Sequence, residues 1–293
     1  MIKKIAFTIA LALFAISNFA QETADTVKYW KFNGGISLSF SQVSLTNWAA
    51  GGENSYAMNG VLNLSSTYSK NNNDWANALN IGYGLQKQGD QEVRKSDDQI
   101  DFVSKYGRKV SNSFFMSAML NFKTQFTDGM KYEKDTSYII SRFMAPAYLQ
   151  GALGFEYKPS EVFYAVLSPG AVKLTIVMDD TLSANGAFGV KAGDKSRLEL
   201  GGAASIGVKT NVMKNVSLNS TLGLFSNYLE NPQNIDVNWN VFILMKINDF
   251  LSANLTTQLI YDDDIKTSDK DGNVKGAKVQ FKEVFGVGLT YKF

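Results

Sequence analysis

The stretch FFMSAMLNFKTQF, from Phe114 to Phe126, alternates between apolar and polar side chains over most of its length. One set of alternate positions holds Phe114, Met116, Ala118, Leu120, Phe122 and Phe126, and the other holds Ser117, Asn121, Lys123 and Gln125. Because successive side chains of a β-strand point to opposite faces, this pattern predicts a strand with one apolar and one polar surface. Strands of soluble proteins usually have only about 5 to 6 residues, so this one is long.

The same alternation recurs along the chain and predicts about twelve strands of membrane-spanning length, since a tilted membrane strand needs about 9 to 11 residues within the lipid. The expected spans are 30–41, 54–69, 74–87, 97–108, 113–127, 143–157, 162–175, 196–209, 215–229, 235–247, 250–263 and 277–293. The expected fold class is therefore all-β, an up-and-down antiparallel transmembrane β-barrel. Fourteen strands are the alternative, if the chain divides further near Pro169 or within 176–195. Pro169 lacks a backbone donor and is expected to bend or interrupt its strand.

The connections between these strands alternate in length, with a short turn at one end of the barrel and a longer loop at the other. Short turns are expected near 70–74, 108–112, 158–161, 210–215 and 247–249, and long loops near 42–53, 88–96, 128–142, 176–195 and 262–276. Apolar-face aromatic residues gather at both ends of the strands, as in the girdles at the two membrane interfaces. Both patterns are typical of barrels in the cell outer membrane, with short periplasmic turns, extracellular loops and lipid around the wall.

The first twenty residues predict a signal peptide. Lys3 and Lys4 precede an apolar run from Ile5 to Ile16, which is too short for a spanning helix of about 20 residues. Ala20 stands before the expected cut at Gln21. The expected organisation is a signal peptide at 1–20, a short periplasmic segment at 21–29 and the barrel at 30–293.

Composition excludes several classes of function. The chain has no histidine and no cysteine, so a Ser-His-Asp triad, a Cys-His pair and a His-ligated zinc are unavailable. We therefore expect no enzyme activity and no cofactor. Without the two lysines of the signal peptide, 27 basic residues face 27 acidic ones, and a neutral chain argues against nucleic acid as a partner.

Three loop motifs resemble binding sites at first sight. Gly52 is followed by Glu53 and a strand, not by the lysine and helix that a phosphate-binding loop requires. The stretch DDDIKTSDKDGN, from Asp262 to Asn273, fails as a calcium loop because Lys278 stands where a bidentate glutamate is needed. A looser divalent-cation site at the rim is the alternative to a solvated turn. The carboxylate pairs Asp97–Asp98 and Asp179–Asp180 are expected to be solvated loop charges.

The polar faces of the predicted strands carry charged residues that would point into the lumen. These lumen-facing candidates are Lys31, Asp101, Lys105, Lys123, Glu156, Arg197, Glu199, Lys209, Asp236 and Lys246. They either line a narrow aqueous pore or pair into a network that fills the interior. Because their signs are mixed, the sequence predicts no ion preference.

The last residues, VFGVGLTYKF, end on Phe293 with Tyr291 and Leu289 alternating behind it. This segment resembles the C-terminal assembly signal of bacterial outer-membrane barrels, which implies the barrel assembly machinery as a partner during biogenesis. The stretches SLTNWAAGGENS (44–55), NYLENPQNIDVNWN (227–240), QLIYDDDI (258–265) and VQFKEVFGVGLTYKF (279–293) are similar to an uncharacterised Bacteroidota-type outer-membrane family, a domain of unknown function. The resemblance implies a barrel over essentially the whole mature chain and supplies no activity or site residues.

The stretch SLTNWAAGGENS is expected to be the first extracellular loop, with Gly51 and Gly52 reversing the chain and Trp48 at its tip. We expect Trp48 to fold over or into the barrel mouth, with contact to a partner as the second interpretation. The sequence leaves two functions open. One is a narrow channel or porin for small solutes, and the other is a non-conducting structural or accessory barrel that binds proteins or glycans through its loops.

Overall fold

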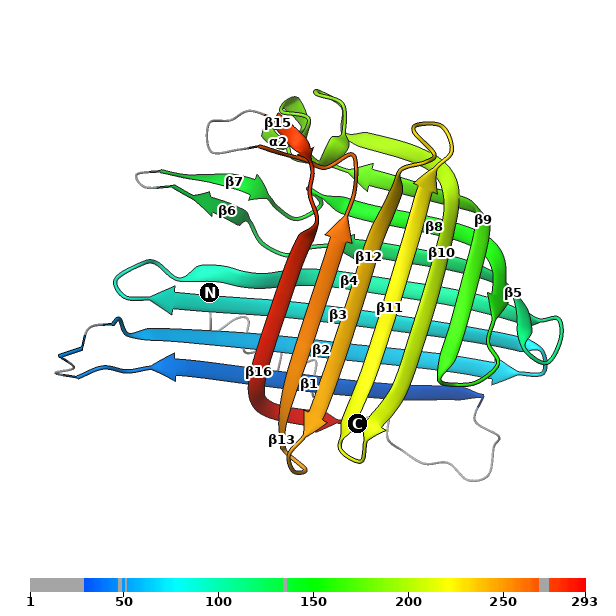
Figure 1. Cartoon of the computed structure of the whole chain (residues 1–293), viewed down its shortest axis with the longest axis horizontal. Helices are drawn as coiled ribbons and strands as arrows, with labels where there is room; N and C mark the ends of the chain where they lie inside the picture. Colours follow the sequence, from blue (N-terminus) through cyan, green and yellow to red (C-terminus); the bar gives the residue numbers. More distant parts are fainter. Residues whose placement is uncertain (1–28, 47–48, 51, 134–135, 269–273) are drawn as a thin grey trace.

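The chain forms a closed antiparallel β-barrel of twelve strands (Figure 1). The computed structural model describes residues 29–46, 49–50, 52–133, 136–268 and 274–293. The barrel strands are β1 (Trp30–Val43), β2 (Ser55–Lys70), β3 (Asn73–Gln88), β4 (Arg94–Lys109), β5 (Phe114–Thr124), β8 (Ala147–Tyr157), β9 (Phe163–Ile176), β10 (Ser196–Met213), β11 (Val216–Asn227), β12 (Ile235–Lys246), β13 (Leu251–Tyr261) and β16 (Gln280–Lys292). Each strand pairs with its neighbours along the chain, and β16 pairs with β1. The predicted fold class and the count of twelve are confirmed.

The remaining elements lie in the longer connections. They are the hairpin β6 (Gly129–Tyr132) and β7 (Ser137–Ser141), the helices α2 (Asp180–Ala184) and η1 (Ala187–Gly189), and the hairpin β14 (Lys266–Ser268) and β15 (Val274–Ala277). The described part of the 176–195 connection thus contributes two short helices and no extra barrel strand. We call this end of the barrel the long-loop end and the opposite one the short-turn end. The expected segments 1–20 and most of 21–29 lie outside the described residues.

The outer surface of the barrel is apolar and the inner surface carries the charged side chains. Exposed apolar residues on the outer surface include Leu38, Met116, Leu153, Phe155, Leu167, Leu198, Phe281 and Phe285. At the short-turn end, Trp30 packs against Tyr68 and Trp75 with ring centroids 5.2 and 5.7 Å apart. In Figure 1 the strands β10–β13 and β16 cross β1–β4 at a large angle, because barrel strands tilt and the view passes through two walls. Neither described helix is long and apolar enough to span a membrane.

Pro169 lies at a bulge in β9. The register of β9 shifts against β8 between Leu153 and Phe155, and against β10 between Gly201 and Ala203. The strand continues through the proline, so the wall bends there without being interrupted. Before the bulge Val166 and Ser168 are buried, whereas after it Ala171 and Thr175 are. The inward positions of β9 therefore change from even to odd residue numbers.

The seam between β1 and β16 closes the barrel. Gly35 to Ser39 pair with Lys292 to Gly288, and the amides of Gly34 and Phe293 each donate to the other's carbonyl at 2.8 and 3.0 Å. At Gly288 the neighbouring strand is very close. A Cβ added there would overlap the carbonyl oxygen of Leu38 and lie 2.6 Å from Ser39 Cα. The seam thus requires glycine at position 288.

The substitution Gly288→Ala is expected to destabilise the barrel by about 1–3 kcal/mol, the usual cost of overpacking. Urea unfolding of the refolded barrel in detergent, followed by its heat-modifiable gel mobility, measures the change. Gly35→Ala is the matched control in the same seam, because its Cβ would meet nothing closer than Tyr291 O at 3.7 Å. Equal stability of the two variants would contradict a close-packed seam at Gly288.

Candidate functional site

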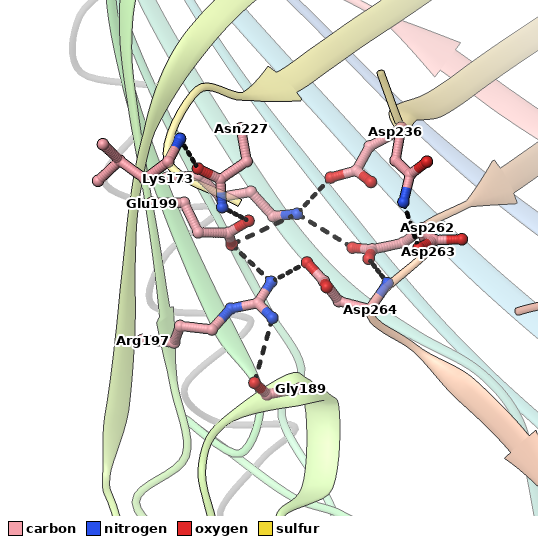
Figure 2. A network of polar contacts seen from close by, with 11 residues as sticks. Lys173, Gly189, Arg197, Glu199, Asn227, Asp236, Asp262, Asp263 and Asp264 are labelled. Atoms are coloured by element: carbon pink, nitrogen blue, oxygen red, sulfur yellow. Dashed lines mark hydrogen bonds and ion pairs between the residues drawn. The ribbon is translucent and has the colours of Figure 1, made fainter. Parts of the chain in front are cut away.

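Lys173 lies at the centre of a charged cluster inside the long-loop end (Figure 2). Its Nζ is 2.7 Å from Asp236 Oδ2 on β12, 3.0 Å from Asp262 Oδ2 just after β13 and 3.7 Å from Glu199 Oε2 on β10. The bulge in β9 turns Lys173 inward, so that it meets carboxylates on β10, on β12 and just after β13. One ammonium group therefore holds together three segments that are far apart in the sequence.

Arg197 extends this cluster toward the loops. Its Nη2 lies 2.8 Å from Glu199 Oε2 and 2.5 Å from Asp264 Oδ2, and its Nη1 donates to the carbonyl of Gly189 at 3.2 Å. Since Gly189 belongs to η1, Arg197 ties the β9–β10 connection to the barrel wall (Figure 2). We call Lys173, Arg197, Glu199, Asp236, Asp262 and Asp264 the mouth network. It contains two basic groups and four carboxylates.

A second ion pair crosses the lumen at the same end. Lys282 on β16 pairs with Asp97 on β4. Three strands separate β16 from β4 around the wall, namely β1, β2 and β3. The two side chains therefore meet across the interior, not along the wall, and the lumen is narrow at this level.

Charged pairs deeper in the barrel are more open to solvent. Lys123 Nζ lies 3.3 Å from Asp101 Oδ2, and Lys105 pairs with Glu156 and lies over the ring of Tyr164. The side chains of Lys123 and Lys105 are 28% and 23% exposed, whereas Lys173 is 12% and Glu199 only 2% exposed. Although Glu156 is also buried, water reaches both deeper lysines. Lys173 and Glu199 are therefore more enclosed than the two deeper lysines, whereas Asp264, at the outer edge of the mouth network, is 30% exposed.

The structure brings most of the lumen-facing candidates into ion pairs. Asp101, Lys105, Lys123, Glu156, Arg197, Glu199 and Asp236 all have partners across or along the inner wall. Lys246 instead pairs with Asp249 in the next turn at 2.7 Å, where both are largely exposed. Lys31 and Lys209 lie exposed near the short-turn end.

Sequence reasoning missed Lys173, Lys282, Asp262 and Asp264 as members of the lumen charges. A strict alternation counted from Val166 and Ser168 places Lys173 outside, and only the bulge at Pro169 and Gly170 reverses this. The alternative expectation for this loop is a loose divalent-cation site. In the structure two of its carboxylates are bound to basic side chains, Asp262 to Lys173 and Asp264 to Arg197. Among the described residues no group of three or more acidic side chains is arranged to hold a metal ion.

The expectation that Asp97 and Asp98 are solvated loop charges is wrong. Both lie in β4, and the side chain of Asp98 is only 2% exposed. Asp98 accepts hydrogen bonds from the backbone amides of Phe126 and Thr127 at 2.7 and 2.9 Å and pairs with Lys95 at 2.9 Å. It therefore fixes the start of the β5–β8 connection to β4, which a count along the sequence could not predict.

A small ordered cap joins two of the long connections. Arg142 pairs with Asp179 at 2.8 Å, and Asp179 caps α2 by accepting from the Leu182 amide at 2.9 Å. The Leu182 hydrogen bond, followed by the charge of Arg142, lowers the pKa of Asp179, so this carboxyl stays charged at neutral pH. An apolar cluster of Ala145, Val177, Leu182 and Val190 lies beneath. Asp180, in contrast, is solvent-exposed and pairs with Lys195.

The first long loop is described in part. Gly52 has a φ of 119°, as expected for a chain reversal that needs glycine, and Leu45 N donates to Asn54 Oδ1 at 2.7 Å. Trp48 and Gly51 lie outside the described residues. The placement of Trp48 over the mouth stays a prediction.

Comparison with known proteins supports the family resemblance over one part of the chain. A family model described as a protein of unknown function (DUF3078) matches residues 40–130. The C-terminal stretches that also carried the expected resemblance lie outside this match. No curated protein matches the chain.

Solved structures with a similar fold are barrels. The translocator domain of the autotransporter NalP from Neisseria meningitidis is 9% identical with a TM-score of 0.39, over 98% of this chain and 96% of that one. The COG4313 outer membrane channel from Pseudomonas putida F1 is 11% identical with a TM-score of 0.40, over 92% and 100%. The TodX monoaromatic hydrocarbon channel deltaS2 mutant is 8% identical with a TM-score of 0.35, over 91% and 90%. Similarity at this level carries no information on activity.

Proposed function

We propose that this chain is an outer-membrane barrel that forms a narrow channel for small solutes, with the mouth network as its constriction and a preference for small cations. The observation that carries this proposal is the composition of the mouth network. Two basic groups and four carboxylates lie together on the inner side of the wall from β9 to the end of β13, so this part of the mouth has an excess of negative charge. Selectivity in narrow pores follows the sign of the charge at such constrictions, and acidic rings favour cations.

The location in the outer membrane is supported by the two surfaces of the wall. Apolar side chains cover the outside, and the inside carries ion pairs that water reaches at Lys105 and Lys123. This is the reverse of a soluble barrel, whose interior is apolar, and it matches barrels with a polar lumen in lipid. The aromatic group of Trp30, Tyr68 and Trp75 at the short-turn end fits an interfacial girdle.

The second candidate is a non-conducting accessory barrel that binds proteins or glycans through its loops. It is favoured by the cap of Arg142 and Asp179 and by the crossing pair Asp97–Lys282, because both narrow the long-loop end. Enclosed ion pairs of this kind are compatible with a filled, non-conducting interior as well as with the lining of a pore.

Planar-bilayer recordings under a potassium chloride gradient separate the two functions. We expect small single-channel currents whose reversal potential shows a preference for potassium over chloride. Asp264→Asn removes one of the surplus carboxylates and is expected to reduce this preference, whereas Asp249→Asn, an exposed turn carboxylate at the short-turn end, leaves it unchanged. Absence of conductance at any voltage would contradict the channel and favour the accessory barrel.

A further inference from the structure

An open apolar groove runs across the outer surface of the wall from β3 to β10. Its volume is about 920 Å³, within the range of sites that hold small organic ligands. Its sides are formed by Leu120, Leu153, Val172 and Leu200. Its floor lies at Gly151 and Gly170, where an added Cβ would meet no atom within 4 Å. The missing side chains of these two glycines therefore create the groove.

The groove follows the pairing direction of the strands. Trp75 is the register partner of Tyr106, Tyr106 of Ala118, Ala118 of Leu153 and Leu153 of Gly170. Because barrel strands tilt against the axis, this row runs diagonally over the wall from the short-turn end toward the long-loop end. Trp75 and Tyr106 mark one end of the groove and Tyr228 the other.

The chemistry of the lining calls for an apolar occupant. Trp75 Nε1 donates to Ser104 Oγ at 2.9 Å, and the Tyr106 hydroxyl donates to Asn73 Oδ1 at 2.6 Å. These polar atoms are already satisfied within the wall, so a polar ligand at this end of the groove would be desolvated without a partner. Tyr228, whose ring lies over Gly202, places its hydroxyl at the far end.

The shape of the groove favours a flexible chain over a second protein. The wall of another barrel is convex and would bridge the flanking leucines without reaching Gly151 or Gly170. A single hydrocarbon chain is narrow enough to lie between them, and aromatic rings at both ends suit the level of lipid headgroups. An acyl chain in the membrane is already in an apolar surrounding, so its transfer into the groove removes no apolar surface from water. The favourable free energy of binding therefore comes from packing contacts along the groove.

We propose that this groove is a lipid site, in which an acyl chain of a membrane lipid is held longer than the surrounding lipid. The groove is continuous with the apolar outer surface, so the site rests on the proposed membrane location and is independent of channel activity. Bound lipid fills the thin part of the wall beside the bulge at Pro169. Behind it, Ala152, Ala171 and Phe225 form a buried apolar cluster on the inner side.

Tryptophan quenching tests this site in vesicles of phospholipid with brominated acyl chains. Trp75 is kept as the single tryptophan by changing Trp30, Trp48 and Trp239 to phenylalanine, and brominated lipid is titrated against unlabelled lipid. We expect Trp75 to be quenched at low brominated fractions. Gly151→Leu and Gly170→Leu place a side chain on the floor, where the added Cβ meets no atom within 4 Å. Both are expected to weaken this lipid binding about tenfold, or about 1.4 kcal/mol.

Gly60→Leu is the matched control, because Gly60 pairs with Leu38 and Tyr83 on the outer surface outside the groove. Identical titrations for the control and the two groove variants would overturn the lipid site, as would a dimer of the parent chain that Gly151→Leu dissociates. Failure of all variants and the parent to insert into vesicles would instead overturn the membrane location. Native mass spectrometry of lipid retained by the parent and the groove variants gives the second readout.

Discussion

Replacing Lys173 by methionine is expected to destabilise the barrel by about 3–5 kcal/mol, the usual loss when one partner of a buried ion pair is removed. Methionine keeps the unbranched apolar stem of the lysine but removes its ammonium group, so Asp236 and Asp262 lose their cation, while Glu199 keeps only Arg197. Lys173 is only 12% exposed, so solvent cannot replace its charge. We expect the long-loop end to loosen first.

Urea unfolding in detergent measures this loss, and Lys246→Met is the matched control. Lys246 also bonds a carboxylate at 2.7 Å, that of Asp249, but the two side chains are 53% and 83% exposed. Exposed pairs contribute only about 0–1 kcal/mol, so the control should be nearly neutral. Equal losses in both variants would mean that Lys173 does not hold the mouth network together.

The same substitution also tests the constriction. Without Lys173 the mouth network keeps four carboxylates and one basic group, so a conducting barrel should become more selective for cations. An unchanged reversal potential with an intact fold would place the ion pathway elsewhere.

Much of the fold could be predicted because its signal is local. The alternation of apolar and polar residues predicts which side chains lie on the apolar outer surface, and the turn residues predict where each strand ends. The predicted fifth segment, 113–127, illustrates the limit. The strand ends at Thr124, because the chain there leaves the wall, fixed by the carboxylate of Asp98 on β4. Strand ends of this kind depend on contacts between distant segments.

The candidate site could be predicted only in part for the same reason. Glu199 and Arg197 lie on the correct phase of β10 and were found by alternation, as was Asp236 on β12. Lys173 was missed because a bulge of one residue reverses the phase of β9 between Ser168 and Ala171. The set of carboxylates that pair with one lysine depends on how the barrel closes. The alternation pattern along the sequence carries no information on these pairs.

Placing an arginine on the outer wall tests the orientation of the two surfaces. Leu120→Arg is expected to cost about 2–4 kcal/mol of stability in lipid, the penalty for a cation near the membrane midplane of a barrel. Leu120 lies inside β5 and its side chain is 43% exposed on the outer surface. In water such a position would accept arginine freely, so a large loss requires lipid contact.

The adjacent residue provides the control at the same depth. Asn121 points inward, and its Nδ2 donates to Asp101 Oδ1 at 2.7 Å. Asn121→Arg therefore introduces the same charge beside a carboxylate in the solvated part of the lumen, where it should cost much less. Both variants are refolded into vesicles and unfolded with guanidinium, with the parent chain alongside. If Leu120→Arg were as stable as the parent while Asn121→Arg unfolded, the assigned faces would be reversed; if both were neutral, the outer surface would face water and the chain would not be a membrane barrel.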